Sequence, residues 1–203
     1  MKKVNRYLFV GLCMTVLLAG CSAGSGNDTG ERNTSEESTD EKKEDGTGKS
    51  LVVYFSHSGN TKKIAEAISK KTNSDLFEIT TAEEYSSNYD TVVELAQEEK
   101  NDQARPKLKS ELSNLADYQT IYLGFPIWWG DMPMVLYSFL DEYDLSGKTI
   151  APFCTHGGSG LSGTAKKIER EEPKATVHAG LEISDSSLDR SDSDIEQWVG
   201  NLK

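Results

Sequence analysis

The amino-acid sequence predicts an α/β domain in which a doubly wound, five-stranded parallel sheet lies between helices. From residue 51 onward, short apolar runs alternate with segments whose apolar residues recur at helical spacing. The apolar runs are continuous, which is typical of parallel strands buried on both faces. Strands that alternate with helices need crossover connections, and such connections produce a parallel sheet.

Five stretches have the length and the apolar character of buried strands. The first stops at a polar turn rich in hydroxyl groups. In chain order, the expected strands are LVVYFS (51–56), DLFEIT (75–80), TIYLGF (120–125), TIAPFCT (149–155) and TVHAGLEI (176–183).

A helix is expected after each strand. Ile64 and Ile68 recur at helical spacing in the first helix, and Val92 and Ala96 do so in the second. Pro133 precedes the third helix, at a position where helices tolerate proline. The expected helices lie at 61–71, within 88–100, and at 134–143, 164–170 and 191–202.

The first twenty residues are predicted to be a lipoprotein signal peptide rather than part of the fold. Lys2, Lys3 and Arg6 precede an apolar stretch (7–18) that is too short to span a bilayer comfortably. The sequence LLAGC, which ends at Cys21, resembles the bacterial lipobox, and a plain secretory signal is the alternative. The resemblance implies acylation of Cys21 and an extracytoplasmic protein that is lipid-anchored to a bacterial membrane.

Residues 21–50 are expected to form a disordered acidic linker, and residues 51–203 the folded domain. The linker contains no large apolar residue between positions 22 and 50, so it cannot bury enough surface to offset its chain entropy. Of the three cysteines, Cys13 leaves with the signal peptide and Cys21 carries the lipid. Cys154 is therefore left without a disulfide partner, and we expect it to be a buried, inert thiol.

The composition excludes some classes of function. The net charge of -11 argues against a nucleic-acid ligand, because phosphate backbones require a basic face. The acidity either serves solubility or steers a basic partner toward the protein. With three histidines and no closely spaced pair of cysteines, the sequence predicts no metal site.

The loop SHSGNT (56–61) connects the first strand to the first helix, at the edge of the sheet where ligands of such folds bind. A helix N-terminus presents free N–H groups, Gly59 allows close approach, and the hydroxyl and amide side chains add donors. These features predict a phosphate site without Lys or Arg. The alternative is N-capping of the helix by Asn60 or Thr61. The pattern is not that of a nucleoside triphosphate loop.

Two further loops follow the third and fourth strands. In GFPIWWGDMP (124–133), Trp128 and Trp129 could form the wall of a planar ring, or both could be structural anchors. In CTHGGSGLSG (154–163), the glycines leave backbone N–H groups accessible to the polar edge of a ring. His156 could touch the ligand or be structural. Together the three loops describe a site for a mononucleotide with a flat polar ring.

Taken together, these loops are similar to those of the flavodoxin-like family. YFSHSGNT (54–61) resembles the flavodoxin phosphate loop, and GFPIWWGDMP and PFCTHGGSG resemble the two ring-binding loops. The segment YDTVVELAQEEKNDQARP (89–106) resembles the same group, the short-chain bacterial flavodoxins. The resemblance covers nearly all of residues 51–203. It implies the strand order 2-1-3-4-5 and FMN bound without a covalent bond.

The resemblance also implies which residues hold FMN. One difference concerns the second ring-binding loop, which often carries a tyrosine in flavodoxins but has His-Gly-Gly here. The outer face of the flavin is then open, or covered by Trp128 or by residues 85–106. The implied cofactor-binding residues are Ser56, His57, Ser58, Gly59, Asn60, Thr61, Pro126, Ile127, Trp128, Trp129, Thr155, His156, Gly157 and Gly158.

Three functions stay open at this stage. The first is an electron carrier that needs no catalytic side chain and exchanges electrons with a redox partner protein or a quinone. The second is an FMN-dependent oxidoreductase that passes hydride from NAD(P)H to a quinone-type acceptor. The third is a binding module that keeps the fold without the flavin. A serine hydrolase, which the sequence HGGSG could suggest, is excluded, because Ser159 and Ser162 both lack the flanking pair of glycines of a Gly-x-Ser-x-Gly elbow.

Overall fold

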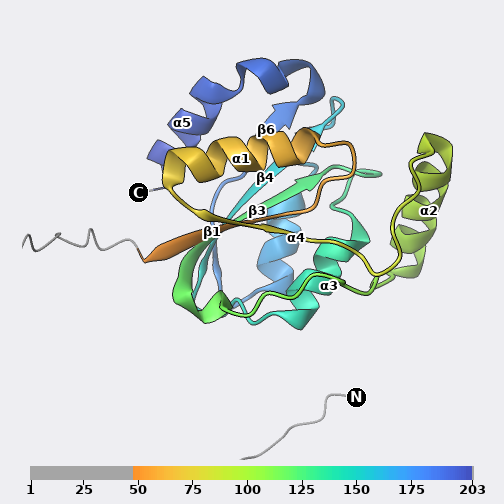
Figure 1. Cartoon of the computed structure of the whole chain (residues 1–203), viewed down its shortest axis with the longest axis horizontal. Coiled ribbons are helices and arrows are strands. Elements are labelled where there is room, and N and C mark those ends of the chain that lie inside the picture. The colour runs from red at the N-terminus through yellow and green to blue at the C-terminus, as the bar shows by residue number, and fades with distance from the viewer. Residues whose placement is uncertain (1–47, 203) are drawn as a thin grey trace, which may run out of the picture. The chain divides into compact units, whose positions relative to one another are not determined.

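Parallel strands form a single sheet in the order β2-β1-β3-β4-β5, as predicted, and β6 pairs with β4 (Figure 1). The computed structural model describes residues 48–202. The predicted signal peptide (1–20) and Cys21 lie outside the described residues. The strands are β1 (Lys49–Tyr54), β2 (Asp75–Glu78), β3 (Tyr118–Pro126), β4 (Thr149–His156), β5 (Thr176–Val177) and β6 (Leu181–Ser184).

Apart from shifts of one or two residues at other strand ends, two features of the sheet differ from the prediction. The first strand begins at Lys49, so Lys49 and Ser50 belong to the sheet rather than to the linker. The single fifth strand expected at 176–183 is divided into β5 and β6. Ile150 of β4 still accepts a hydrogen bond from the His178 N–H (2.9 Å), but Pro152, two residues on, has no N–H to donate. The ladder with β4 resumes at Phe153, which pairs with Leu181.

The helices lie close to their predicted positions. No described side chain caps α1, whereas the Asn88 side chain caps α2 by accepting a hydrogen bond from the Thr91 N–H. The helices are α1 (Asn60–Thr72), α2 (Tyr89–Asp102), α3 (Met134–Glu142), α4 (Thr164–Glu171) and α5 (Asp192–Gly200), with short 3₁₀ turns at Leu115–Asp117 and Asp185–Arg190.

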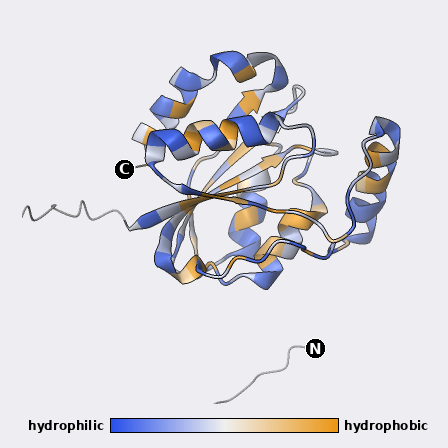
Figure 2. Ribbon diagram, in the orientation of Figure 1, coloured by the Kyte–Doolittle hydropathy of each residue, from blue (hydrophilic) through white to orange (hydrophobic). Residues whose placement is uncertain are grey.

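Side chains of the central strands alternate between two hydrophobic layers. In β1, Val52 and Tyr54 point to the layer shared with α1 and α5, whereas Leu51 and Val53 point to the layer shared with α3 and α4. Figure 2 shows hydrophobic strands flanked by helices that are hydrophilic on much of their surface. Both faces of the sheet are therefore buried, which explains the continuous apolar runs in the sequence.

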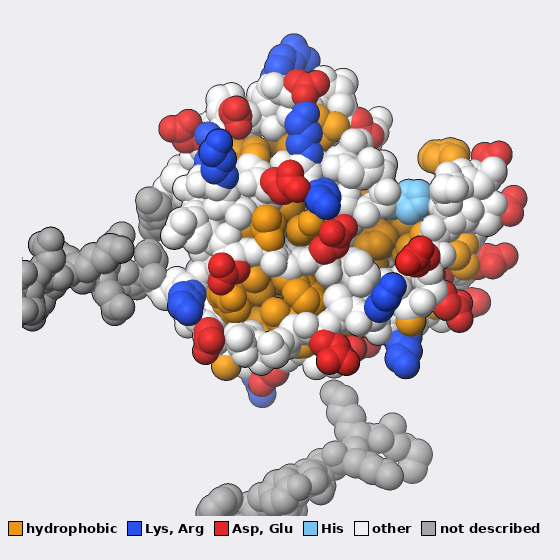
Figure 3. Space-filling view, in the orientation of Figure 1, with side chains coloured by type: hydrophobic (Ala, Val, Ile, Leu, Met, Phe, Trp, Pro, Cys, Tyr) orange, Lys and Arg blue, Asp and Glu red, His pale blue; other side chains and the backbone are white. Residues whose placement is uncertain are grey.

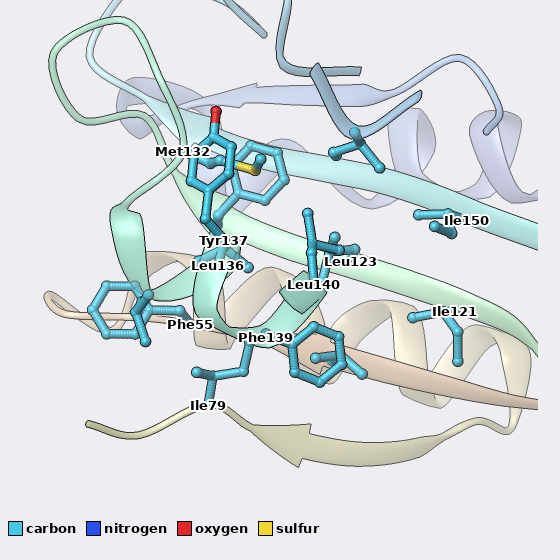
Figure 4. Packing of buried hydrophobic residues seen from close by; sticks show 14 of the residues in the cluster. Phe55, Ile79, Ile121, Leu123, Met132, Leu136, Tyr137, Phe139, Leu140 and Ile150 are labelled. Carbon is cyan, nitrogen blue, oxygen red and sulfur yellow. The ribbon is translucent and has the colours of Figure 1, made fainter. Parts of the chain in front are cut away.

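The second layer is centred on α3. Figure 4 shows Leu136, Phe139 and Leu140 of this helix packed against strand residues that include Leu123. All four side chains are at most 5% exposed. This well-packed layer supports the end of the sheet at which the loops of interest begin.

Helix α2 does not cover the sheet as a helix of a doubly wound fold is expected to. It lies apart from the two helical layers, at the edge of the molecule (Figure 1). Only Val92 and Ala96 of this helix are buried. The segment that follows α2 contributes Leu108, Leu112 and Leu115 to the layer beneath the sheet. Within residues 48–202, no helix is long and apolar enough to cross a membrane.

Candidate functional site

The loops after β1, β3 and β4 surround one cavity of about 580 Å³ at the carboxyl edge of the sheet, which we call the ring cavity. This is the edge at which ligands of open α/β sheets bind. The predicted residues that line it are His57, Ser58, Asn60, Pro126, Ile127, Trp128, Trp129, Thr155, His156 and Gly157. The other four predicted residues (Ser56, Gly59, Thr61 and Gly158) lie in the same loops but do not line this cavity.

The loop after β1 leaves the N-terminus of α1 accessible. Gly59 has a φ of 90°, a conformation that strains other residues, and its N–H donates to the Ser56 hydroxyl (3.2 Å). The side chains of Asn60 and Thr61 make other contacts and do not cap α1, so the N-capping alternative is not realised. The exposed first turn is thus available to bind an anion through its backbone N–H groups.

Polar contacts join this loop to more distant parts of the chain. The hydroxyl groups of Thr61 and Thr155 form a buried hydrogen bond (2.8 Å), which links the phosphate loop to the end of β4. The Asn60 amide donates to Asp185 (3.1 Å), just beyond β6. The Lys63 ammonium is paired with Asp189. Because the nearby cation is already paired, attraction for an anion depends mainly on the helix N-terminus.

A tight turn presents the two tryptophans. Trp128 and Asp131 exchange two backbone hydrogen bonds (2.8 and 2.9 Å) across Trp129 and Gly130. Trp129 and Gly130 both have positive φ values (51° and 71°), as in a type I′ hairpin turn. The turn therefore fixes Trp129 at its tip and Trp128 at its base.

The two tryptophans have different surroundings. Trp128 is partly buried and makes edge-to-face contacts with Phe55 (5.5 Å between ring centroids), Tyr85 (5.3 Å) and His57 (6.0 Å). Trp129 is 47% exposed, and its indole N–H donates to the Val93 carbonyl of α2 (2.9 Å). Trp128 is thus packed into the aromatic cluster, whereas Trp129 presents more of its ring to solvent, and both side chains line the ring cavity.

A partly buried ion pair supports the turn from below. The carboxylate of Asp131, 8% exposed, pairs with the Lys167 ammonium of α4 (2.6 Å) and accepts a hydrogen bond from the Tyr137 hydroxyl (3.1 Å). Burial and the negative charge of Asp131 raise the pKa of Tyr137 well above its usual value, so its hydroxyl stays protonated as a donor. Side chains from α3 and α4 thereby hold the tryptophan turn in place.

The loop after β4 forms the opposite wall of the ring cavity. His156 accepts a hydrogen bond from the Gly158 N–H through Nδ1 (3.0 Å), and Gly158 has a φ of 130° that only glycine adopts readily. Cys154 is fully buried, and burial raises the pKa of its thiol to about 12. The thiol is therefore protonated and inert at neutral pH, as the sequence predicted.

The residues that sequence reasoning did not assign to the site come from α2 and from the turn after β6. Helix α2 contributes Tyr89, Val92, Val93 and Ala96 to the ring cavity, and the turn contributes Asp185. The sequence indicated α2 in part, because residues 85–106 were one of two candidates, with Trp128, for covering the outer face of a flavin that could also be open. Asp185 had no such signal, since only the tertiary structure brings it to within 3.1 Å of Asn60.

An aromatic cluster lies between the phosphate loop and α2. His57 contacts Tyr85 and Trp128 edge to face. Its Nε2 donates a hydrogen bond to the Ser86 carbonyl (2.9 Å). The Tyr85 hydroxyl donates to the Glu99 carboxylate (2.9 Å). Burial raises the pKa of Glu99, whereas the hydrogen bond from Tyr85 opposes that rise. The side chain of His57 therefore connects the loop to the segment that precedes α2, a role the sequence did not predict.

Charge around the site is mostly negative. Acidic side chains gather along the edge of the molecule where α2 lies (Figure 3). Helix α2 carries Asp90, Glu94, Glu98, Glu99 and Asp102. Among the described residues, no cluster of side chains is suited to hold a metal ion. The arrangement can hold an anionic group at the start of α1 and a flat ring beside the tryptophan turn.

Comparisons with known proteins agree with this geometry. A family model described as flavodoxin matches residues 49–202. A candidate flavoprotein from Bacteroides eggerthii is 30% identical, with a TM-score of 0.69 and coverage of 76% of this chain and 98% of that chain. One from Bacteroides uniformis is 32% identical, with a TM-score of 0.68 and coverage of 76% and 99%.

A flavoprotein from Lactobacillus acidophilus, solved in complex with FMN, shares the fold at 23% identity and a TM-score of 0.62. The match covers 75% of this chain and 99% of that chain. No curated protein matches the chain significantly.

Proposed function

Because the chain belongs to the flavodoxin family, we propose that it binds FMN in the ring cavity and acts as an electron-transfer protein. The observation that carries this proposal is the meeting of three predicted loops around one cavity. An accessible helix N-terminus lies at one end of that cavity, and an exposed tryptophan lies at the other. When bound, FMN would supply one- and two-electron chemistry that side chains cannot perform.

The residues present fit the parts of FMN. The first turn of α1, with the hydroxyl of Ser58, would bind the phosphate. Asp185 would accept hydrogen bonds from ribityl hydroxyls, because it lies beside Asn60 and lines the cavity. The ring would lie between the tryptophan turn and the loop after β4, with the aliphatic side chains of α2 completing its surroundings. These groups bind, orient and exclude water, and none of them needs to react.

The side chains around the ring also favour the oxidised form over a reduced, anionic one. The net charge of the chain is -11, and the Asp185 carboxylate lines the cavity. A negative and partly desolvated site opposes further negative charge, so reduction becomes harder than in water. This is the property expected of a low-potential electron carrier.

An oxidoreductase that uses NAD(P)H and a quinone is the second candidate. The specific observation in its favour is that the loop after β4 lacks the tyrosine that often covers the flavin in flavodoxins, since it reads His-Gly-Gly. Rapid oxidation of NADPH by the FMN-loaded protein in the presence of menadione would favour this reading over the carrier.

We further propose that the protein works outside the cytoplasm, held to a membrane by acyl chains on Cys21. The support is the lipobox-like sequence LLAGC and the polar linker after it. Its redox partners would then be a protein or a quinone at the membrane surface. Mass spectrometry of the native protein tests this, and an intact N-terminus without acyl chains would contradict it.

The visible spectrum tests the function directly. The full chain is purified, mixed with FMN and reduced stepwise under anaerobic conditions. We expect a yellow protein that is reduced in two separate one-electron steps. A yellow protein reduced in a single two-electron step would favour the oxidoreductase. A colourless protein that does not respond to FMN would show that the fold serves as a binding module without a flavin.

A further inference from the structure

Trp128 and Tyr85 form a close pair of oxidisable rings beside the ring cavity. Their ring centroids lie 5.3 Å apart, and the rings meet edge to face at 84°. Trp128 lines the ring cavity, whereas Tyr85 does not and lines a second cavity of about 630 Å³ instead. Indole and phenol lose a single electron more readily than most side chains, and an electron passes easily between rings in contact. The pair therefore connects the wall of the ring cavity to a residue outside it.

The hydroxyl of Tyr85 has a proton acceptor in place. It donates to the two carboxylate oxygens of Glu99 on α2, at 2.9 and 3.2 Å. Burial and the charge of Glu99 raise the pKa of Tyr85 above its usual value, so the ring is a neutral phenol at neutral pH. A phenol that loses an electron becomes strongly acidic. Glu99 is thus positioned to take the hydroxyl proton as the electron leaves.

The indole N–H of Trp128 differs from those of the other two tryptophans. Trp129 donates to the Val93 carbonyl and Trp198 donates to the Ala179 carbonyl, both at 2.9 Å. Among residues 48–202, the N–H of Trp128 has no hydrogen-bond acceptor, and it is not fully buried. An oxidised indole loses this proton readily to water, whereas a carbonyl oxygen is too weak a base to take it. Trp128 is therefore the tryptophan best placed to form a neutral radical.

Tyr85 is the only described tyrosine that combines a tryptophan contact with a carboxylate acceptor. Tyr122 meets the Trp198 ring edge to face (5.7 Å), but its hydroxyl donates to no group within residues 48–202. Other tyrosine hydroxyls donate to carboxylates away from any tryptophan ring, in the pairs Tyr54–Glu78, Tyr118–Asp75 and Tyr137–Asp131. Only the surroundings of Tyr85 thus suit the coupled transfer of an electron and a proton.

We propose that Trp128, Tyr85 and Glu99 form a relay that carries an oxidising equivalent out of the ring cavity, whether or not FMN is bound. A one-electron oxidant, such as an oxygen-derived radical, takes an electron from Trp128, and the indole proton passes to water. Tyr85 then gives an electron to the Trp128 radical and its hydroxyl proton to Glu99. Trp128 takes up a proton from water and is restored. The products are a neutral Tyr85 radical and a protonated Glu99.

Pulse radiolysis of the full chain, freed of flavin, tests the relay separately from the proposed function. Azide radicals oxidise indole in preference to phenol, and tryptophan and tyrosine radicals have distinct absorption bands. We expect the tryptophan-radical band to decay as the tyrosine-radical band rises, at a rate independent of protein concentration. A tyrosine band that does not rise, or whose rate of rise scales with protein concentration, would overturn the relay.

Two tyrosine variants compare the relay with the matched pair beside α5. Tyr85→Phe keeps the ring but removes the hydroxyl, so the coupled rise of the tyrosine band should disappear. Tyr122→Phe makes the same change next to Trp198, and its coupled rise should equal that of the wild type. Trp128→Phe should remove the coupled rise as Tyr85→Phe does. Equal rises in Tyr85→Phe and Tyr122→Phe would overturn the assignment of Tyr85.

Glu99→Gln tests the proton acceptor while Tyr85 keeps a hydrogen bond, because an amide oxygen also accepts from a hydroxyl. An amide does not hold the proton, so the rise should slow at least about tenfold, in keeping with the contribution of a positioned base. Glu98→Gln makes the same change at an exposed position of α2 and should react like the wild type. If Glu99→Gln reacts as fast as Glu98→Gln, Glu99 is not the acceptor and the relay is overturned.

The relay should also leave a lasting chemical difference at the ring cavity. After continuous exposure to the same radical, mass spectrometry of peptides measures the oxidised fraction of Trp128. We expect this fraction to be several-fold higher in Tyr85→Phe than in Tyr122→Phe, because a Trp128 radical that is not reduced persists until it reacts irreversibly. Equal oxidation of Trp128 in the two variants would show that no oxidising equivalent is carried away from the cavity.

Discussion

Trp128 and Trp129 are adjacent in the sequence, yet the turn gives each a different environment. Trp128 packs into the aromatic cluster, whereas Trp129 is 47% exposed beside the ring cavity. The sequence suggested ring binding or anchoring for both. The distinction arises because Trp128 lies at the base of the type I′ turn and Trp129 at its tip, and only the three-dimensional path of the chain shows which one meets the cluster.

Replacing each tryptophan with alanine should therefore produce different losses. Trp128→Ala should lower the free energy of unfolding by about 2–3 kcal/mol, because it leaves a partly buried cavity. Trp129→Ala should lower stability less but weaken FMN binding by about 1–3 kcal/mol through lost stacking. Urea unfolding and FMN titration measure the two effects. Equal losses of FMN affinity in the two variants would contradict the assignment.

Ser58 offers a residue-scale test of the phosphate loop. Its side chain is exposed and lines the ring cavity, so Ser58→Ala should leave the fold intact. Loss of one hydrogen bond to a charged phosphate should weaken FMN by about 1.5–3 kcal/mol. Riboflavin has no phosphate and should bind the variant and the wild type alike. If both ligands lose affinity equally, the loop does not hold the phosphate.

At the scale of elements, the residue that follows helix α4 carries a carboxyl group with a raised pKa. Glu172 follows α4 and is 9% exposed. Burial, together with the nearby carboxylates of Asp144, Glu171 and Asp141, raises the pKa of Glu172 from its usual 4.5 to about 7. The folded state therefore holds this proton more tightly than the unfolded chain does. The stability contributed by Glu172 is present at low pH and is lost as the pH rises from about 4.5 to 7.

Glu172→Gln should remove the loss of stability that the ionised Glu172 carboxylate causes at high pH. At pH 8 we expect the variant to be more stable than the wild type by about 1–2 kcal/mol, a value reduced for partial solvent screening. At pH 4 the carboxyl is protonated in both states, so the two proteins should unfold at similar urea concentrations. A stability difference that is the same at pH 4 and pH 8 would show that the pKa of Glu172 does not change on folding.

Helix α2 is the element that sequence reasoning described least completely. The spacing of Val92 and Ala96 predicted a helix within residues 88–100, and the observed helix runs from Tyr89 to Asp102. The packing of this helix was not predicted, because an apolar face of only two buried residues does not specify what it packs against. The surrounding hydrogen bonds from Tyr85 and Trp129 decide that α2 lies over the ring cavity rather than on the sheet.

At the scale of the whole molecule, FMN should stabilise the fold, because the ring cavity forms only when the separate loops meet. A ligand that binds only the folded state at one hundred times its dissociation constant contributes about 2.7 kcal/mol. For a domain of this size the melting temperature should rise by roughly 5–10 °C. Differential scanning fluorimetry with and without FMN measures this shift. An unchanged melting temperature at saturating FMN would argue against a site in the folded state.

The amino-acid sequence by itself determined the fold class, the strand order through the family resemblance, and the loops that form the cavity. These features are local: apolar periodicity sets strands and helices, and glycines and hydroxyl side chains mark the turns after them. Parallel crossovers then bring the carboxyl ends of the strands to one edge. For this reason, ten of the fourteen predicted residues line a single cavity.

Only the tertiary structure decided which groups complete that cavity. Asp185 and the inner face of α2 reach it from distant parts of the chain, and the Lys167–Asp131 pair supports the turn from another helix. The division of the last strand followed from Pro152 in its neighbour rather than from its own residues. Such contacts depend on side chains far apart in sequence, whose meeting is set by packing and hydrogen bonding and leaves no periodic signal along the chain.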